Sequence, residues 1–317
     1  MTSVTYHLLA MLVMASSVSA NGGVAKIAEP MEITRPGHYR VVRNITAPGT
    51  SPAIAILASR VTLDVNALTL SNGDASSPVI RLGTGVQDVV IRDGYLDGGA
   101  GIYGSPKSVR IERMHIRAIK GRGISLTMDP PQNSVSVLNC TMNTGDGAGI
   151  RITGQDVRIR NNYIRGKEHG IDLMNVSNGE IVDNTVNLTA DPAITIQGSG
   201  GQILIRDNVL TGDPYALRVE TSNNLILNNL LTSNDDALRI LGKSNRAIGN
   251  KVRGDFTTGI VVGGSSNVVE ENQVTGEVCG IRFLNDNDHI YRNNILRDTK
   301  GDAVCGPPNT DAGGNIQ

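Results

Sequence analysis

The stretch from Gly149 to Leu296 decides the fold, and residues 170–187 within it read GIDLMNVSNGEIVDNTVN. The stretch divides into rows of 21 to 24 residues, and every row then holds an asparagine at one fixed position: Asn162, Asn184, Asn208, Asn229, Asn250, Asn272 and Asn294. A second column with the same period places an aliphatic residue after a small one: Gly149-Ile150, Gly170-Ile171, Ala193-Ile194, Ala216-Leu217, Ala237-Leu238, Gly259-Ile260 and Gly280-Ile281. Two columns that share one period indicate a repeat protein.

Each row predicts one coil of a β-solenoid. The rows contain short β-type segments such as Gly170–Leu173, Gly179–Val182 and Thr185–Asn187, and no helical periodicity runs for ten residues. Three strands and three turns fit into one row, and successive coils would stack about 4.8 Å apart. An asparagine repeated in register can form an amide ladder, and it also tolerates the left-handed backbone of a tight turn. The alternative is that these are ordinary turn asparagines of a β-sandwich.

The rows resemble those of the right-handed parallel β-helix proteins, the pectate-lyase-like superfamily. The segment Arg60–Leu70, RVTLDVNALTL, is similar to the first coils of repeat proteins in that superfamily. The resemblance covers about residues 35–305 and implies an all-β, single-stranded, right-handed parallel β-helix of about 11–12 coils with an asparagine ladder. It says little about activity, because this fold hosts lyases, hydrolases, epimerases and proteins without catalysis.

Composition and the first residues bear on partners and location. The chain has 317 residues, 19% of them charged, and a net charge of −1, so we expect neither nucleic acid nor an anionic membrane as partner. Residues 1–20 read as a signal peptide, because an apolar run from Leu8 to Met14 precedes the small-x-small pattern Val18-Ser19-Ala20. The run is too short to span a bilayer. We therefore predict export to the periplasm or beyond, without membrane insertion; a disordered tail is the alternative.

The remaining chain divides into three predicted parts. Residues 21–52 are expected to form an N-terminal cap, residues 53–305 the parallel β-helix, and residues 306–317 a C-terminal tail or cap. A longer row carries Met128–Ser134, the best candidate for a protruding loop.

Three cysteines have different expected roles. Cys140 falls in the ladder column, which favours a buried structural thiol. Cys279 and Cys305 lie on neighbouring rows but are offset by three positions, so ideal strands would hold them roughly 10 Å apart. A disulfide between them is therefore not favoured, although an irregular last coil leaves it open. No histidine and cysteine spacing indicates zinc.

Strand alternation predicts which side chains point outward from the first strand of each row, the surface called the first-strand face below. The predicted outward column is Ala55, Arg81, Tyr103, Ser125, Arg151, Asp172, Thr195, Arg218, Arg239, Val261, Arg282 and Cys305. Gln197 and Glu220 belong to the next outward column, and His169, Tyr215 and Asp236 to the turn before the strand.

We interpret several of these residues as a site for an acidic polysaccharide. Arginine recognises carboxylates in a planar, bidentate way, so Arg151, Arg218 and Arg239 could hold a sugar acid. Glu220, Tyr215 and Asp236 complete the predicted substrate-binding set. The alternative is a salt-bridged surface in which Arg218, Glu220 and Arg239 satisfy one another.

The residues favour some reactions over others. Hydrolysis needs two carboxyl groups about 5 to 9.5 Å apart, whereas Asp172 and Glu220 would lie roughly 11 to 12 Å apart on an ideal sheet. The motifs of the polygalacturonases and alginate epimerases of this fold are also missing. Lyase or epimerase chemistry needs a cation for the uronate carboxylate and an acid–base pair, for which His169, Asp172 and Tyr103 are the candidates.

Two functions stay open. The first is an exported lyase or C5-epimerase of an acidic, uronate-containing polysaccharide; the second is a non-catalytic β-helix that binds a surface glycan or a protein. No cofactor or metal is predicted, and calcium lacks the dense carboxylate cluster that it needs.

Overall fold

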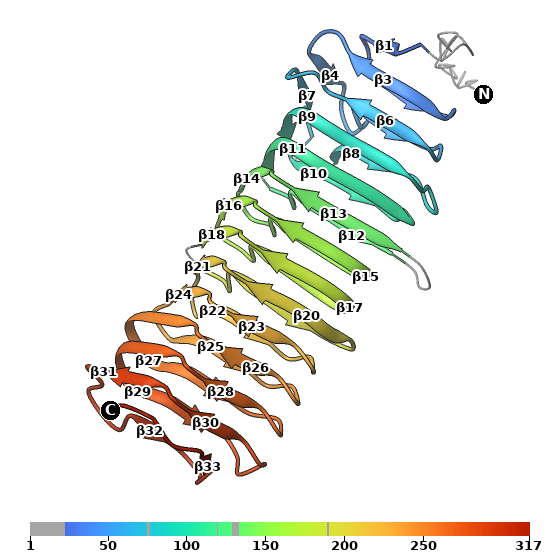
Figure 1. The fold of residues 1–317 in the computed structure, drawn as a ribbon. Coiled ribbons are helices and arrows are strands. Elements are labelled where there is room, and N and C mark those ends of the chain that lie inside the picture. The colour runs from blue at the N-terminus through green and yellow to red at the C-terminus, as the bar shows by residue number, and fades with distance from the viewer. Residues whose placement is uncertain (1–22, 75–76, 119, 129–132, 189) are drawn as a thin grey trace, which may run out of the picture.

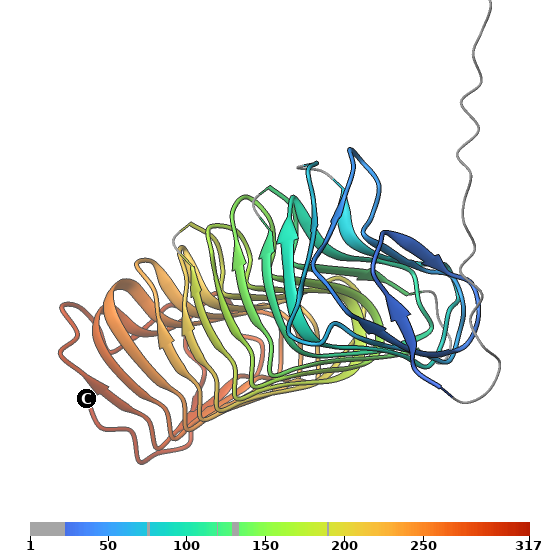
Figure 2. The ribbon, with the colours of Figure 1, turned by 90° about the horizontal axis from the view of Figure 1, so that it is seen from above.

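The protein is an all-β rod in which the chain winds as a right-handed parallel solenoid of about 12 turns (Figure 1). This computed structural model describes residues 23–74, 77–118, 120–128, 133–188 and 190–317, and all regular elements in these ranges are strands. The coils lie in chain order from one end of the rod to the other, as Figure 2 also shows. The predicted signal peptide, residues 1–20, and residues 129–132 of the predicted loop lie outside the described residues.

The coil has three strand faces, and every pairing between coils is parallel. The first-strand face contains β2 (Met31–Ile33), β5 (Ile54–Ile56), β8 (Pro78–Leu82), β10 (Ala100–Gly104), β12 (Ile124–Thr127), β19 (Ile194–Gln197), β22 (Tyr215–Val219), β25 (Asp236–Ile240) and β32 (Val304–Cys305), with the starts of β15 (Ile150–Arg160) and β17 (Ile171–Val182) and the ends of β27 (Lys251–Val262) and β29 (Gln273–Phe283).

The other two faces follow around the coil. The second-strand face contains β1 (Ala25–Ile27), β3 (Gly37–Val41), β6 (Val61–Asp64), β13 (Ser134–Leu138), β20 (Gly201–Arg206), β23 (Leu225–Leu227), β26 (Arg246–Ile248), β28 (Val268–Glu270), β30 (Ile290–Arg292) and β33 (Thr310–Asp311), the starts of β9 (Val89–Gly98) and β11 (Ser108–Ala118), and the ends of β15 and β17. The third-strand face contains β4 (Ile45–Ala47), β7 (Thr69–Asn72), β14 (Thr141–Thr144), β16 (Tyr163–Gly166), β18 (Thr185–Leu188), β21 (Val209–Thr211), β24 (Leu230–Thr232) and β31 (Ile295–Arg297), the ends of β9 and β11, and the starts of β27 and β29.

The interior is a stack of aliphatic side chains. The anchor column from Ile54 to Ile281 is fully buried, as the repeat predicts. The residue before each anchor is small because it faces the third-strand side of the core. A Cβ at Gly149 would lie 2.5 Å from Ile164 Cγ2, and one at Gly170 would lie 2.2 Å from Val186 Cγ1. The period of the sequence therefore reflects packing inside each coil.

The predicted asparagine ladder is confirmed. Each ladder side chain donates to the amide oxygen of the next, at 2.9 Å from Asn208 to Asn229 and 2.9 Å from Asn229 to Asn250. The same oxygen also accepts the backbone N–H of the preceding rung, and the ladder continues to Asn315. Buried backbone groups at this turn are thus satisfied by side chains.

The left-handed residue of this turn is the one before the ladder asparagine rather than the ladder asparagine itself. Positive φ values of 53° to 64° occur there in consecutive coils, at Asn139, Asn161, Asp183, Asp207, Asn228, Gly249, Glu271 and Asn293. The two columns therefore have separate roles. The residue before each ladder position adopts the left-handed backbone conformation, and the ladder asparagine makes the hydrogen bonds between coils.

A second ladder, which we did not predict, follows the turn between the first-strand and second-strand faces. Asn224 donates to Asn245 at 2.8 Å, and the backbone N–H of Asn245 donates to Asn267. The next rung is His289, whose Nδ1 accepts the backbone N–H of Asn267 at 3.2 Å. Its backbone N–H in turn donates to Asn309.

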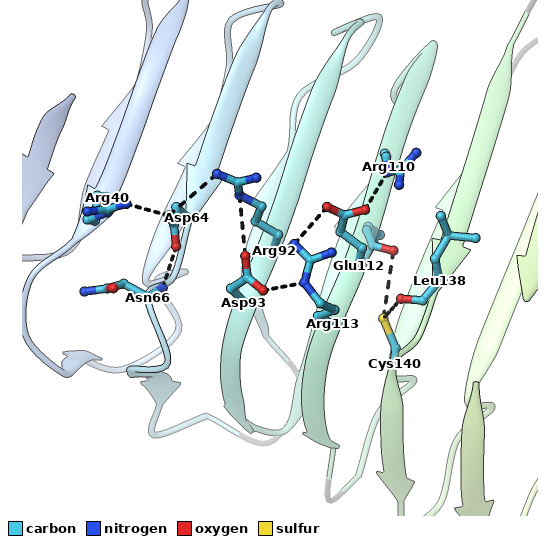
Figure 3. Close-up of polar contacts among 11 residues, drawn as sticks. Arg40, Asp64, Asn66, Arg92, Asp93, Arg110, Glu112, Arg113, Leu138 and Cys140 are labelled. Carbon is cyan, nitrogen blue, oxygen red and sulfur yellow. Dashed lines mark hydrogen bonds and ion pairs between the residues drawn. The ribbon is translucent and has the colours of Figure 1, made fainter. Parts of the chain in front are cut away.

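The outer side of the second-strand face carries ion pairs both within a coil and between neighbouring coils (Figure 3). Asp93 accepts from Arg113 at 2.6 Å, and Glu112 pairs with both Arg113 and Arg110. A single exposed ion pair contributes little to the free energy of unfolding. The ion pairs leave this face with few free charges, and the candidate site lies elsewhere.

Cys140 occupies the start of the first ladder, as the sequence predicts. Its thiol is buried and donates to Leu138 O at 3.3 Å, while its backbone N–H donates to Asn162. Burial raises the pKa of this thiol to about 12, so it stays protonated and unreactive.

Strand pairing extends into both ends of the chain. Within the predicted cap of residues 21–52, strand β2 pairs in register with β5, and β3 pairs with β6. At the other end β33 pairs with β30, and Ile316 forms a bridge to Ile295. Residues 25–47 and 310–316 therefore continue the coil, because their strands stack in register on the rows next to them.

Cys279 and Cys305 form a disulfide, the pairing that the sequence left open but did not favour. Their Cα atoms are 6.3 Å apart. The estimate of roughly 10 Å assumed straight strands. Cys279 instead lies where β29 turns from its pairing with β31, which ends at Thr275, to its pairing with β32, which begins at Ile281. Across such a turn the direct distance is shorter than the distance along the strand.

Candidate functional site

The outward column of the first-strand face has the predicted register. Tyr103 pairs with Ser125, Ser125 with Arg151, and Arg151 with Asp172. Further along, Thr195 pairs with Arg218, and Arg218 with Arg239. The predicted site residues thus lie along one line, but Tyr103 and Arg239 are six coils apart, or about 29 Å. They form two groups rather than one site.

The first group surrounds a hollow of about 350 Å³, called the arginine pocket below. Its lining consists of Arg122, Ser125, Leu126, Thr127, Arg151, Thr153 and Met174. Three hydroxyls and two guanidinium groups give it a polar, cationic character, and none of these lining side chains carries a carboxylate. Such a donor set suits an anionic, hydroxyl-rich ligand.

Asp172 lies beneath this pocket. Although it belongs to the outward column, its side chain is only 3% exposed, because Arg151 and Gln197 cover it. Arg151 Nε is 3.3 Å from one carboxylate oxygen, and Gln197 Nε2 donates to the other at 3.1 Å. With both oxygens engaged, Asp172 is placed to orient Arg151.

Tyr103 lies at the rim of the pocket. Its hydroxyl accepts the backbone N–H of Arg122 at 2.9 Å, which fixes the turn that carries Arg122. The Arg122 side chain itself makes one long hydrogen bond to Ser125 Oγ at 3.4 Å. Within the described part of the chain it forms no ion pair, so its charge is available to a ligand.

His169 is half-buried in the turn before β17, and its ring contacts neither Asp172 nor Tyr103 by a hydrogen bond among the described residues. Its Nδ1 atom is buried without a hydrogen-bond partner there. The structure thus separates the three residues predicted as catalytic, leaving only Tyr103 and the covered Asp172 beside the pocket.

The second group is a cluster around Tyr215. Two guanidinium groups lie near its ring, with Cζ of Arg218 at 5.8 Å and Cζ of Arg239 at 5.3 Å from the ring centroid. Arg218 is hydrogen-bonded to Glu220, and Arg239 donates to Asp236 at 3.1 Å and to the Tyr215 hydroxyl at 3.2 Å. The cluster therefore fits the alternative of a salt-bridged surface, in which the charged side chains pair with one another, and Arg239 pairs with Asp236.

Asp236 has a pKa above the ordinary value of an aspartate. Burial raises it, and the neighbouring Asp235 adds to the rise, while the Arg239 guanidinium opposes both. The predicted substrate-binding residues here are thus occupied with one another, whereas the arginine pocket keeps a free guanidinium.

Arg122 is the residue that sequence reasoning missed. It lies two positions before the anchor Ile124, as Tyr215 lies two positions before Leu217 and Asp236 two before Leu238. The same rule that selected Tyr215 and Asp236 would have found it. No group of three or more histidine, cysteine, aspartate or glutamate side chains that could hold a metal occurs in the described ranges. No helix there is long and apolar enough to cross a membrane.

Comparison with known proteins agrees with this architecture. Residues 99–252 match a family model described as a right handed beta helix region. Among solved structures, the A-module of the Azotobacter vinelandii mannuronan C-5 epimerase AlgE6 is similar with a TM-score of 0.66 and 16% identity, covering 94% of this chain and 91% of that one. A mutant of the periplasmic alginate epimerase AlgG has a TM-score of 0.64 and 13% identity, with coverage of 86% and 77%.

The Dettilon tailspike protein gp208 is also similar, with a TM-score of 0.57 and 12% identity over 85% of this chain. The chain spans 61% of the tailspike's length. No curated protein sequence matches. At these identities the likeness shows the fold, a right-handed parallel β-helix, which is the architecture that the rows of the sequence indicate.

Proposed function

We propose that this protein binds an acidic, uronate-containing polysaccharide along its first-strand face, with a sugar carboxylate held in the arginine pocket. The observation that carries the proposal is the free guanidinium of Arg122 in a hollow whose lining side chains offer three hydroxyls and no carboxylate. Arg151 faces the same hollow and is oriented from below by Asp172. Two guanidinium groups and several hydroxyls match the groups that a uronate sugar presents.

The spacing of the coils supports the same ligand. Sugar residues in a linear polysaccharide repeat at about 5 Å, close to the coil spacing of about 4.8 Å. A chain that lies along the rod can therefore meet similar positions on successive coils. The mannuronan and alginate epimerases among the structural neighbours are named for acidic polysaccharides, which supports this ligand class by analogy.

Binding without catalysis is the form of the proposal that the geometry favours. Of the three predicted catalytic residues, Asp172 is covered and paired, and the Tyr103 hydroxyl is bound to the Arg122 backbone. The pocket is left with cationic groups and hydroxyls, which suit recognition more than proton transfer. We also propose export, because the disulfide needs an oxidising compartment and the first residues resemble a leader.

The test is the variant Arg122→Ala. Because Arg122 has no ion pair in the described structure, its removal leaves the fold intact. Loss of one charge-assisted contact should weaken binding of an alginate or polygalacturonate hexasaccharide about tenfold. Isothermal titration calorimetry measures the affinity, and Arg158→Ala is the control, because it removes an exposed arginine from the second-strand face, where that arginine pairs with Glu180.

Equal affinity of the Arg122→Ala variant and the wild type would contradict this site. The same samples report on the alternative function. A rise in absorbance from unsaturated uronate, or a change of configuration at C5 of the sugar, would show a lyase or an epimerase instead of a binding protein.

A further inference from the structure

The third-strand face carries a second set of outward side chains that the proposed site does not use. Along one column Tyr95 pairs with His115, His115 with Thr141, and Thr141 with Tyr163. Four consecutive coils thus align these side chains on the outside of β9, β11, β14 and β16.

The aromatic rings of this column face the solvent. Tyr95 and Tyr163 are each 45% exposed, whereas Tyr39 is buried and Tyr103 and Tyr215 are half-buried. The ring of Tyr95 stacks on His115, with centroids 4.9 Å apart and an angle of 16° between the planes. Among the residues that the structure describes, neither exposed tyrosine hydroxyl has a hydrogen-bond partner. A flat, partly polar ring with a free hydroxyl is well suited to a sugar ring, which has both C–H and hydroxyl groups.

The adjacent outward column gives this surface a positive charge. It runs through Asp97, Arg117, Asn143, Arg165 and Asn187. The only carboxylate in the two columns between Thr69 and Asn187, all of whose members the structure describes, is Asp97, and Arg117 binds it with two hydrogen bonds. Arg165 is exposed beside Tyr163 and forms no ion pair within the described ranges. Its charge therefore has no local partner and favours an anionic ligand.

We infer that Tyr95, His115, Tyr163 and Arg165, called the tyrosine platform below, form a second binding surface for an acidic polysaccharide. Sugar rings stack on Tyr95 and Tyr163, and Arg165 binds a carboxylate. The two tyrosines are three coils apart, about 14 Å, which is close to three sugar residues at the coil-matched repeat. The ligand class rests on the proposed function, but the platform is a separate surface on another face of the coil.

Two surfaces on one rod would have a measurable consequence. A long polysaccharide or two neighbouring chains could engage both faces, so long polymers would bind more tightly than hexasaccharides through a high effective concentration. Short oligosaccharides would occupy the two surfaces independently.

The experiment uses the full chain and hexasaccharides of alginate or polygalacturonate. Isothermal titration calorimetry counts the bound hexasaccharides per chain, and its signal does not depend on the tyrosines that the variants replace. Wild-type protein should bind two hexasaccharides per chain. The variant Tyr95→Ala/Tyr163→Ala should lose one of the two sites, weakened about tenfold or more, whereas Tyr95→Phe/Tyr163→Phe retains the rings and should keep both.

The outcomes separate this inference from the proposed function. Loss of all binding in Arg122→Ala/Arg151→Ala would overturn the platform and leave the arginine pocket. Loss of all binding in Tyr95→Ala/Tyr163→Ala, with Arg122→Ala unaffected, would overturn the pocket and leave the platform. Equal binding of an uncharged dextran hexasaccharide, or binding of single-stranded DNA in place of uronates, would overturn the assigned ligand. Thermal unfolding of each variant establishes that a variant which no longer binds is still folded.

Discussion

Replacing Asn229 with alanine is expected to lower the free energy of unfolding by about 3 to 5 kcal/mol, a large share of the stability of a typical domain. The Asn229 side chain makes four hydrogen bonds in the first ladder and is fully buried. Alanine leaves the backbone N–H and one of the two side-chain N–H groups of Asn208 without an acceptor, at a position that is fully buried. Each orphaned buried group costs about 1 to 3 kcal/mol.

Urea denaturation followed by circular dichroism measures this loss, and Asn187→Ala provides the control. Asn187 lies on the exposed side of β18, so its removal should change the stability by less than about 0.5 kcal/mol. A midpoint for Asn229→Ala equal to that of the control would show that the ladder is not a source of stability.

Removing the disulfide with Cys279→Ser/Cys305→Ser is expected to cost about 3 kcal/mol, because the bond closes a loop with a sequence separation of 26. In a repeat protein the effect should concentrate in the coils that the bond joins, since each coil contacts only its neighbours. Hydrogen exchange should therefore accelerate in β29, β31 and β32 while the central coils stay protected.

Thiol counting checks the starting point of this prediction. Wild-type protein, denatured without reductant, should expose one free thiol, that of Cys140. Adding reductant to the wild type should reproduce the faster exchange of the double variant and leave the variant itself unchanged. Three free thiols in protein purified from an oxidising compartment would contradict the bond.

Much of the fold could be predicted because every row of the repeat has to meet the same packing and hydrogen-bonding requirements. The buried Ile or Leu column, the small residue before it and the ladder asparagine each follow from packing or hydrogen bonding that recurs once per coil. The second ladder was harder to recognise, since its rungs mix Asn224 and Asn245 with His289. The disulfide was not favoured from the sequence, because distances along ideal strands ignore the turn that β29 makes between its pairings with β31 and β32.

The candidate site could be predicted only in part. The register of the first-strand face follows from the period, so the line from Tyr103 to Arg239 was predictable. The sequence did not predict which of these side chains are free of ion pairs, because pairing depends on side-chain rotamers. Arg239 is hydrogen-bonded to Asp236 and Arg218 to Glu220. Arg122 has no ion pair among the described residues. A hollow also depends on the volumes of side chains from neighbouring coils, and the sequence does not state these.

The histidine in the second ladder makes one rung sensitive to acid. His289 is fully buried, and its Nδ1 accepts the backbone N–H of Asn267, so the ring proton must reside on Nε2, which contacts Asn285 at 2.8 Å. Burial lowers the pKa of His289 below its ordinary value of 6.5, although Asp288 opposes this. A second proton would remove the acceptor and place a donor against a donor.

The sign of the effect follows from this lowered pKa. Because the pKa of His289 is higher in the unfolded chain than in the folded one, the unfolded chain binds the proton first as the pH falls. The contribution of this rung to the free energy of unfolding is therefore fully present above about pH 6.5 and declines as the pH falls from there toward the folded pKa. Comparing urea midpoints at pH 7.5 and pH 5.5 tests this, with His289→Asn as the control, because an amide at this rung cannot titrate. If both proteins lose the same stability on acidification, the imidazole has no such role. If the wild type loses more stability than His289→Asn, the rod has an acid-sensitive segment near its C-terminal end. Mild acid would then unfold the last coils while the other coils stay folded.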